Sequence, residues 1–185
     1  MEKSNRDKLR TLKTIVVTGP ESTGKTLISA YLAEQMNCPW VPEYARDYIG
    51  SLQRPYTYED LIHISDTQVK TFNTISQNKP SFLILDTWLI ITKIWFLEVY
   101  GKYPPIIDKE IASHKIDLYI VCKPDIPWIP DPLRENGGIK RDYLMSRYLE
   151  EIRKTGSNFT EIGGKANLRY TNAMKAVKGQ FNLAL

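Results

Sequence analysis

Cysteine and histidine are scarce in this chain of 185 residues. Its two cysteines, Cys38 and Cys122, lie far apart in the sequence, and its two histidines, His63 and His114, have no partner at the spacing of metal ligands. This composition excludes a disulfide framework and a structural zinc site. We expect both cysteines to be free thiols in a reducing cytoplasm, and both histidines to be structural or surface residues.

Long apolar runs and a strong charge imbalance are also missing. The most apolar segment, residues 88–99, is interrupted by polar residues and is too short to cross a bilayer. The charged opening "MEKSNRDKLRTLK" is followed by no apolar stretch of the kind that marks a signal peptide. The net charge of +4 is mild, whereas nucleic-acid-binding proteins usually carry a dense basic face. We therefore expect a cytoplasmic protein without nucleic-acid or membrane partners, with residues 1–12 as a solvated tail.

What the sequence does contain is a regular alternation of strand-like and helix-like segments. The strand-like runs are short and rich in β-branched or apolar residues, and helical patterns lie between them. Such an alternation predicts an α/β fold in which a five-stranded parallel sheet lies between two layers of helices. The expected strands are residues 14–18, 39–41, 81–86, 117–122 and 158–164, all within a single domain that spans residues 1–185.

The first strand-like run leads into "GPESTGKT", which matches the pattern G-x-x-x-x-G-K-[ST] of the phosphate-binding P-loop. Glycines allow backbone N–H groups to converge on phosphate oxygens, and the following helix presents its unpaired N–H groups to the same anion. In this chemistry Lys25 reaches the β- and γ-phosphate oxygens of ATP or GTP, and the Thr26 hydroxyl binds Mg²⁺. We therefore expect a three-layer P-loop NTPase fold whose nucleotide-binding residues are Gly19, Glu21, Ser22, Thr23, Gly24, Lys25 and Thr26.

A P-loop NTPase also needs an acidic residue near the metal, at the end of a neighbouring buried strand. Asp86 ends the apolar run "SFLILD" and fits this position. The alternative interpretation is that Asp86 only caps the helix that begins after it, and one aspartate can serve both purposes. We assign Asp86 to the magnesium site.

The segment after the fourth run indicates what kind of P-loop protein this is. Residues 124–141, here called the lid segment, contain several prolines and glycines together with Arg134 and Arg141. In small P-loop kinases such a segment closes over the phosphates, excludes water and brings arginines to the charge that develops during transfer. The guanine-reading N-K-x-D pattern of GTPases is missing from the sequence. These features favour a small-molecule kinase; the alternative for both arginines is a surface position.

The segment after the second run, "VPEYARDY", indicates the acceptor of the phosphoryl group. Glu43 follows the strand where ligands bind in open α/β sheets, and Arg46 and Asp47 share its face if a helix begins there. A phosphate acceptor is already ionised, whereas a hydroxyl acceptor benefits from a carboxylate that takes its proton. Glu43 therefore favours a hydroxyl acceptor such as a nucleoside, with Asp86 as the alternative base and Arg46 or Asp47 at the sugar or the heterocycle. The bland alternative is an exposed, salt-bridged helix start.

Aromatic residues lie just beyond three of the expected strands. Tyr44, Trp88 and Trp128 follow the second, third and fourth runs respectively. A flat cationic heterocycle suits an aromatic face with carboxylates nearby, so we include all three residues as candidate substrate contacts. Burial in the core is the alternative for the two tryptophans.

Several segments together resemble the ribosylnicotinamide kinase domain of NadR-type proteins, and the likeness covers almost the whole chain. They are "GPESTGKT", "WVPEYARDY", "YTYEDLIHISDTQ", "LILDTWLIITKIW" and "DLYIVCKPDIPWIPDPLREN". The first is generic to P-loop kinases, whereas the second, fourth and fifth are much more specific. The resemblance implies ATP-dependent phosphorylation of the 5′-hydroxyl of nicotinamide riboside to nicotinamide mononucleotide in NAD synthesis, on a fold like that of the nucleoside kinases.

The resemblance also implies roles for individual residues. It places Glu43 and Arg46 at the nucleoside, Asp86 at the metal or the acceptor hydroxyl, and Trp128, Asp131 and Arg134 in the lid. The C-terminal "GGKANLRY" is similar to the loop that meets adenine in related kinases, which makes Arg169 a candidate nucleotide contact. Thr160, in the fifth run, is a further candidate for the same role.

The chain departs from the fullest family pattern in one respect. NadR-type proteins commonly carry a nicotinamide-nucleotide adenylyltransferase domain ahead of the kinase, and some carry a DNA-binding domain, whereas only a short segment precedes the first run here. A separate adenylyltransferase is therefore a candidate partner. Two other functions stay open: a kinase for another nucleoside or nucleotide, and a regulatory module that binds nucleotide without catalysis.

Overall fold

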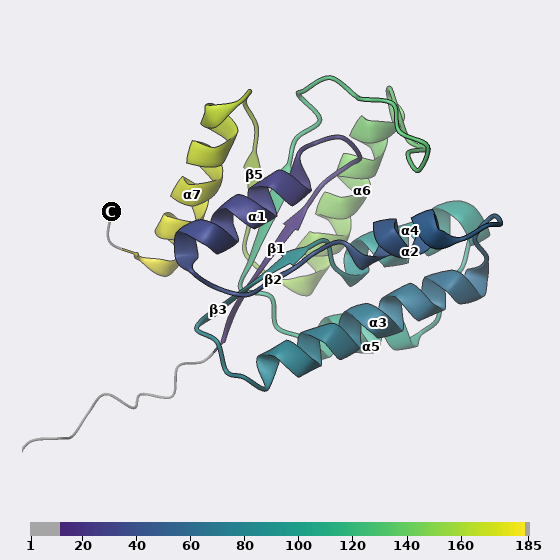
Figure 1. Cartoon of the computed structure of the whole chain (residues 1–185), viewed down its shortest axis with the longest axis horizontal. Helices are drawn as coiled ribbons and strands as arrows, with labels where there is room; N and C mark the ends of the chain where they lie inside the picture. The colour runs from purple at the N-terminus through teal and green to yellow at the C-terminus, as the bar shows by residue number, and fades with distance from the viewer. Residues whose placement is uncertain (1–11, 184–185) are drawn as a thin grey trace, which may run out of the picture.

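A parallel sheet of five strands forms the middle layer of the structure, a computed structural model that describes residues 12–183 (Figure 1). The strands are β1 (Lys13–Thr18), β2 (Trp40–Val41), β3 (Phe82–Asp86), β4 (Leu118–Cys122) and β5 (Phe159–Ile162). They follow the order β2-β3-β1-β4-β5, so the first strand of the chain lies at the centre and β2 and β5 form the edges. The three interior strands are nearly all apolar because helices cover both of their faces.

Helices form the two outer layers. Within residues 12–183 they are α1 (Lys25–Met36), α2 (Tyr44–Ser51), α3 (Tyr58–Ser76), α4 (Leu89–Tyr100), α5 (Ile106–Ser113), α6 (Lys140–Thr155) and α7 (Asn167–Phe181). Helices α1 and α7 pack on one face of the sheet, and α3, α4 and α6 pack on the other (Figure 1). Helix α2 contacts α3, and α5 contacts α4.

Successive side chains of β1 supply the two cores that hold these layers together. Ile15 and Val17 are fully buried in the core shared with Leu32 of α1, whereas Val16 is fully buried in the opposite core with Ile64 of α3. This alternation follows from the two-residue repeat of a strand. Each large apolar side chain buried in this way contributes roughly 1.5–3 kcal/mol, so the layers fix the central strand and the loop that follows it.

The predicted fold class is confirmed, and all five predicted strands lie within two residues of the expected ends. Helix α5 was not predicted, because it is short, follows two prolines and buries only Ile107, which gives too weak an apolar pattern. The predicted tail, residues 1–12, falls outside the described residues except for Leu12. No helix between residues 12 and 183 is long and apolar enough to span a bilayer.

The strand register brings three separate parts of the sequence to one edge of the sheet. Val17 of β1 is level with Asp86 of β3, and Val41 of β2 is level with Leu85. Because all strands are parallel, the segments that follow β1, β2 and β3 emerge side by side at the carboxyl edge. This is where ligands bind in open α/β sheets.

Candidate active site

The P-loop, residues 19–26 between β1 and α1, has a backbone shape that favours glycine at two positions. Gly19 has a φ of 139° and Gly24 a φ of 80°, in the region that L-residues rarely adopt. At Gly19 a Cβ atom would lie 2.5 Å from the carbonyl oxygen of Cys122, so the loop can pass β4 only with glycine there. The Lys25 ammonium donates a hydrogen bond to the Pro20 carbonyl oxygen at 3.0 Å, which folds this side chain back along the loop.

Asp86 ends β3 beside the P-loop and is the least satisfied polar side chain of the site. It is 2% exposed, and neither of its carboxylate oxygens accepts a hydrogen bond from the described residues. Burial, and then the negative charge of Glu43, raises the pKa of this carboxyl from 3.8 to about 6. The nearby Thr26 hydroxyl and Lys25 ammonium act in the opposite direction. The structure therefore gathers Lys25, Thr26, Glu43 and Asp86 at one place.

A magnesium ion fits the unsatisfied carboxylate. Buried polar atoms nearly always have a partner, so two orphaned oxygens indicate a group that completes the site. Mg²⁺ prefers oxygen ligands and usually takes only one or two from protein, with water and phosphate supplying the others. The Asp86 carboxylate and the Thr26 hydroxyl match this donor set, and among residues 12–183 no larger cluster of His, Cys, Asp or Glu is arranged for a metal.

Backbone strain marks the turn that follows Asp86. Thr87 has a φ of 70°, which is rare for a β-branched residue, and its N–H donates to the Val17 carbonyl oxygen at 2.9 Å. Left-handed non-glycine residues concentrate at functional sites because the surrounding structure must hold them in place. The turn ends β3 abruptly and keeps Asp86 at the sheet edge.

Glu43 reaches the same edge from the neighbouring strand. It is the N-cap residue of α2 and is separated from the end of β2 only by Pro42. Its side chain is half-buried, and its charge is one cause of the raised pKa of Asp86, so the two carboxylates lie within electrostatic reach of each other. A reacting group between them would meet one carboxylate from each of two adjacent strands.

The other candidates on α2 have partners outside the P-loop. Arg46 forms an ion pair with Asp131 and so connects α2 to the lid segment. The Tyr44 hydroxyl hydrogen-bonds with Nε2 of His63 on α3 at 2.8 Å, and Asp47 is exposed. The structure thus places Arg46 toward the lid, whereas Tyr44 lies on the α3 side of the site.

Two adjacent P-loop side chains hold the lid segment. The Glu21 carboxylate accepts hydrogen bonds from the N–H of Glu135 at 3.2 Å, the N–H of Asn136 at 3.0 Å and the Asn136 side-chain amide at 2.8 Å. The Ser22 hydroxyl accepts one from the N–H of Ile129 at 3.0 Å. The Glu21 carboxylate is thus directed at the lid segment, and the prediction that Glu21 binds nucleotide now concerns its backbone N–H.

The predicted arginines of the lid segment are also bonded to protein. Arg141 is 6% exposed and donates to the carbonyl oxygens of Ile126 at 3.0 Å and Ser22 at 3.3 Å. The alternative of a surface position is therefore wrong for Arg141, which joins the base of the lid segment to the P-loop. Arg134 is half-buried and donates to the Ile129 carbonyl oxygen at 2.5 Å.

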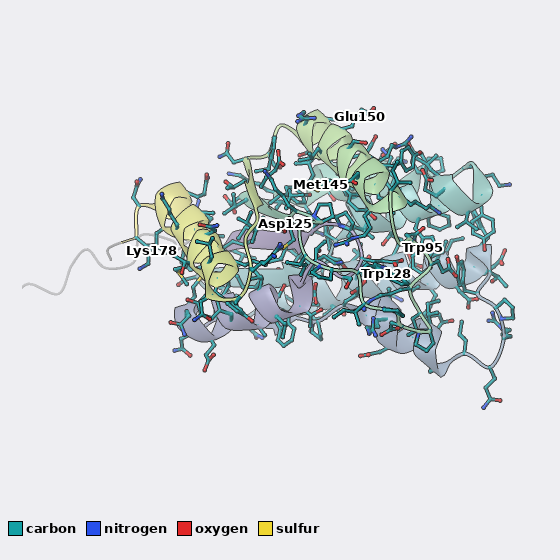
Figure 2. All side chains as sticks on the ribbon, turned by 90° about the horizontal axis from the view of Figure 1, so that it is seen from above. Trp95, Asp125, Trp128, Met145, Glu150 and Lys178 are labelled. Carbon is teal, nitrogen blue, oxygen red and sulfur yellow. The ribbon has the colours of Figure 1, made fainter. Side chains whose placement is uncertain are left out.

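Trp128 packs within the lid segment. A Cβ atom added at Gly137 would lie 3.2 Å from its indole ring, so the ring lies directly on the glycine backbone. Figure 2 shows Trp128 and Asp125 on the connection between β4 and α6. The indole thus links two parts of the lid segment, at residues 128 and 137.

The structure gives the surroundings of two further predicted ligand contacts, Trp88 and Thr160. Trp88 is 2% exposed and packs in the core, with its ring centroid 5.4 Å from that of Phe72 and 5.6 Å from that of His114. The turn at the end of β3 directs this indole inward, which is the core alternative. Thr160 lies in the edge strand β5 level with Ile120, short of the carboxyl edge where the P-loop lies.

Arg169, the candidate adenine contact, is 5% exposed and uses its donors inside the protein. It donates to the carbonyl oxygens of Thr23 at 2.9 Å, Gly164 at 2.9 Å and Lys123 at 3.3 Å, and it forms an ion pair with Asp125. These bonds tie the P-loop to the segments that follow β4 and β5. Arg169 therefore supports the P-loop from within the protein, and its contact with nucleotide stays a prediction.

Sequence reasoning missed Asn136 and Asp125, the partners of Glu21 and Arg169. Both lie in irregular segments, and their contacts join residues more than forty positions apart. No local spacing rule reports such pairs. The one available signal was a carboxylate inside an anion-binding loop, which needs neutralising partners.

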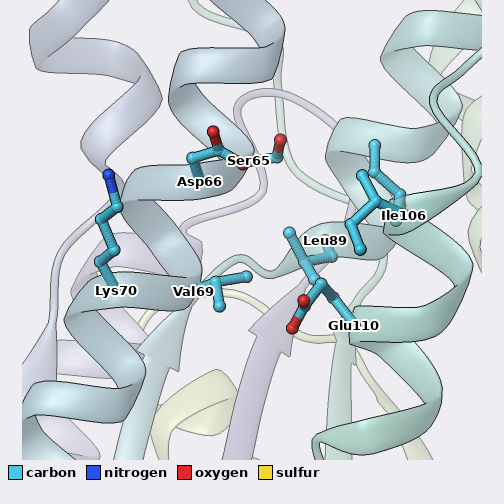
Figure 3. A pocket seen from close by; sticks show the side chains of 8 residues that line it. Ser65, Asp66, Val69, Lys70, Leu89, Ile106 and Glu110 are labelled. Atoms are coloured by element: carbon cyan, nitrogen blue, oxygen red, sulfur yellow. The ribbon is translucent and has the colours of Figure 1, made fainter.

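A hollow of about 260 Å³ lies among α3, α4 and α5 (Figure 3). It is lined partly by apolar side chains, including Val69, Leu89 and Ile106, and partly by charged ones such as Lys70. None of the predicted site residues lines it. We therefore do not assign it to the active site.

Comparison with known proteins supports the sequence resemblance. Residues 14–169 match the model of a protein family described as AAA domain. The trifunctional NAD biosynthesis/regulator protein NadR of Salmonella typhimurium (strain LT2) is 26% identical over 158 residues, which are 82% of this chain and 38% of that protein. The chain thus spans less than half the length of this curated relative.

Solved structures show the same fold. A NadR protein in complex with NR superimposes with a TM-score of 0.77 at 23% identity, over 94% of this chain and 52% of that one. A NadR protein in complex with NAD and AMP-PNP gives a TM-score of 0.74 at 22% identity, over 94% and 50% of the two chains. Thymidylate kinase from Ehrlichia chaffeensis gives 0.64 at 14% identity, over 90% and 99%.

Proposed function

Because the chain belongs to the family described as AAA domain and keeps a complete P-loop, we propose that it is an ATP-dependent kinase acting on the 5′-hydroxyl of nicotinamide riboside. One observation carries the proposal: a half-buried carboxylate and a buried unsatisfied one, Glu43 and Asp86, stand together beside Lys25 and Thr26. The NadR relative is named for NAD biosynthesis, and related solved structures hold NR and AMP-PNP, which supports this substrate pair.

The P-loop would hold the triphosphate of ATP. Its backbone N–H groups and the start of α1 face the β- and γ-phosphates, and Lys25 exchanges its bond to the Pro20 carbonyl oxygen for phosphate oxygens. Bound Mg²⁺, held by Thr26 and Asp86, would neutralise charge on those oxygens. Transfer then depends on positioning and charge stabilisation rather than on a covalent intermediate with the protein.

Glu43 is the proposed base. Its carboxylate takes the proton of the 5′-hydroxyl while the hydroxyl oxygen bonds to the γ-phosphorus; the bond between that phosphorus and its bridging oxygen breaks, which leaves ADP and nicotinamide mononucleotide. Such general-base assistance contributes typically 10²–10⁴-fold. Asp86 is the alternative base, but a carboxylate that holds the metal is not free to accept this proton.

The lid segment would limit access of water to the γ-phosphate. It is held over the P-loop by Glu21 and Ser22 and is joined to α2 by the ion pair between Arg46 and Asp131. Exclusion of water matters because a kinase whose acceptor is a hydroxyl must discriminate against hydrolysis. Arg134 lies in this segment and is the proposed source of positive charge during transfer.

The proposal is tested by measuring ADP release from MgATP with and without nicotinamide riboside, with Lys25→Ala as the blank. We expect release that depends on the riboside and disappears in the blank, with nicotinamide mononucleotide as the product. The fold is also that of a thymidylate kinase, so the same assay is run on a panel of nucleosides and nucleoside monophosphates. Activity restricted to monophosphates overturns the proposal, as does ATP binding without transfer to any acceptor.

A further inference from the structure

A carboxylate inside a phosphate-binding loop presents an electrostatic problem. Glu21 is the third residue of the P-loop, and its negative charge would repel a triphosphate at short range. In the structure this carboxylate accepts hydrogen bonds from three donors of residues 135 and 136, which offset its negative charge. Hydrogen bonds from two backbone N–H groups and an amide to a carboxylate are charge-assisted and are stronger than neutral ones.

The contacts of Glu21 and its neighbour Ser22 reach two parts of the lid segment. Glu21 holds residues 135–136, and the Ser22 hydroxyl accepts a hydrogen bond from the N–H of Ile129. The packing of Trp128 on Gly137 connects these two parts to each other. Two consecutive P-loop side chains therefore fix a loop that is more than a hundred residues distant in sequence.

We propose that Glu21 is a positioning residue that holds the lid segment against the P-loop, and that this contact protects the γ-phosphate from water. The Glu21 carboxylate acts through residues 135–136. The part of the proposal that concerns water rests on the proposed kinase activity. The part that concerns the lid segment does not, because the contact is present in the protein alone.

The contact is tested first without any substrate, by limited digestion with trypsin. Arg134 lies in the lid segment next to Glu135, so cleavage after Arg134 reports opening of this segment. Glu21→Ala removes all three hydrogen bonds, and Glu21→Gln keeps the shape but loses the charge. We expect cleavage of the Ala variant to be at least about tenfold faster than that of the parent, which corresponds to the loss of charge-assisted hydrogen bonds. The rate for the Gln variant should lie between the two. Glu34→Gln, on the exposed side of α1, is the matched control and leaves the rate unchanged.

The partner of Glu21 supplies a second test. Asn136→Ala removes one of the three donors, so it is expected to speed cleavage less than Glu21→Ala does. In the double variant the two effects should not add, because the amide bond is already lost in the Glu21→Ala protein. Additive effects, or cleavage within twofold of the parent in both Glu21 variants, overturn the proposal. If Glu21→Ala fails to fold, the Gln and Asn136 variants decide the question.

The protection from water is measured as the ratio of ADP formed to acceptor phosphorylated, with MgATP and nicotinamide riboside. We expect this ratio to rise severalfold in Glu21→Gln and to stay at the parent's value in the control Glu34→Gln. A nucleotide contact would behave differently: removing the charge would tighten AMP-PNP binding and leave the ratio unchanged, which overturns the proposal. If the parent phosphorylates no riboside, the proposed function fails, whereas the digestion result still decides whether Glu21 holds the lid segment.

Discussion

Two buried aspartates of this protein, Asp60 and Asp86, differ in the hydrogen-bond donors around them and in the direction of their pKa shifts. Asp60, at the start of α3, is 4% exposed and accepts hydrogen bonds from Arg54, the Tyr48 hydroxyl, and both the N–H and the hydroxyl of Thr57. The Arg54 guanidinium, together with the other donors, holds the pKa of Asp60 well below its usual range. Asp86 is equally buried, accepts no hydrogen bond within the described residues and has a pKa raised to about 6.

The difference separates a carboxylate that the fold satisfies from one that we propose a metal ion satisfies. Asp60 completes the capping box of α3 and anchors the segment before it, so its charge is satisfied by the chain itself. The Thr26 hydroxyl and the Lys25 ammonium only partly offset the charge of Asp86, so an added cation or a proton would stabilise it further. Burial alone therefore does not distinguish the two aspartates, whereas the lack of donors around Asp86 does.

The largest expected effect is on activity. Asp86→Asn should lower kcat/KM about a thousandfold, because an amide cannot supply the negative oxygen that the metal needs. Asp60→Asn should leave kcat/KM within about threefold of the parent while lowering the melting temperature, since it weakens the bonds that order α3. Steady-state kinetics and thermal unfolding of both variants measure the contrast. Equal losses of activity would remove the distinction between the two residues.

The next largest effect concerns the neighbour of Asp86. Glu43→Gln should lower kcat about a hundredfold with little change in the affinity for ATP, because it removes a base and leaves the P-loop intact. The negative charge of Glu43 also helps to raise the pKa of Asp86, so the pKa of Asp86 should fall in the Glu43→Gln variant. Turnover and nucleotide binding are measured on the same preparation, and near-normal turnover would remove Glu43 from the role of base.

The stability of the metal-free protein should show the cost of the unsatisfied charge. Because the folded state raises the pKa of Asp86 from 3.8 to about 6, it binds this proton more tightly than the unfolded state does. The contribution of protonated Asp86 to the free energy of unfolding is complete below pH 3.8 and is lost as the pH rises through about 6. The full loss is about 3 kcal/mol.

Asp86→Asn cannot ionise and should escape this loss. Its free energy of unfolding relative to the parent should therefore increase by about 1 kcal/mol between pH 5 and pH 8. Urea unfolding at several pH values, without Mg²⁺, measures the difference. A difference that is independent of pH would mean that Asp86 ionises normally.

The smallest effect tests how well Asp60 is satisfied. Tyr48→Phe removes one donor and leaves Arg54 and Thr57 in place, so we expect the melting temperature to fall by only about 2–4 °C and kcat to stay unchanged. Thermal unfolding measures it. A loss of activity would mean that the Asp60 network reaches the active site.

Much of this architecture could be predicted from the sequence, because the signals are local. The apolar runs indicated where the five strands lie. The pattern from Gly19 to Thr26 identified the P-loop, and the position of Asp86 at a strand end placed it beside that loop. Each of these inferences depends on residues close together in sequence or on the rule that parallel strands end at one edge.

What could not be predicted depends on contacts between distant residues. Trp88 lies in the core because it packs against Phe72 and His114, which are far from it in the sequence. Arg169 and Glu21 were placed in the correct region, but their partners, Asp125 and Asn136, are set by tertiary packing. The side-chain roles at this site were therefore harder to infer than the backbone that carries them.

The hydrogen bonds of Arg169 have a consequence for the folding of this protein during its synthesis on the ribosome. Its guanidinium reaches the Thr23 carbonyl oxygen across 146 positions of the chain, and the segments after β4 and β5 as well. A nascent chain that has exposed only its first half contains the whole phosphate-binding motif but lacks the hydrogen bonds of Arg169. Affinity for nucleotide should thus arise late in synthesis, when the start of the last helix emerges, and not when the motif itself does.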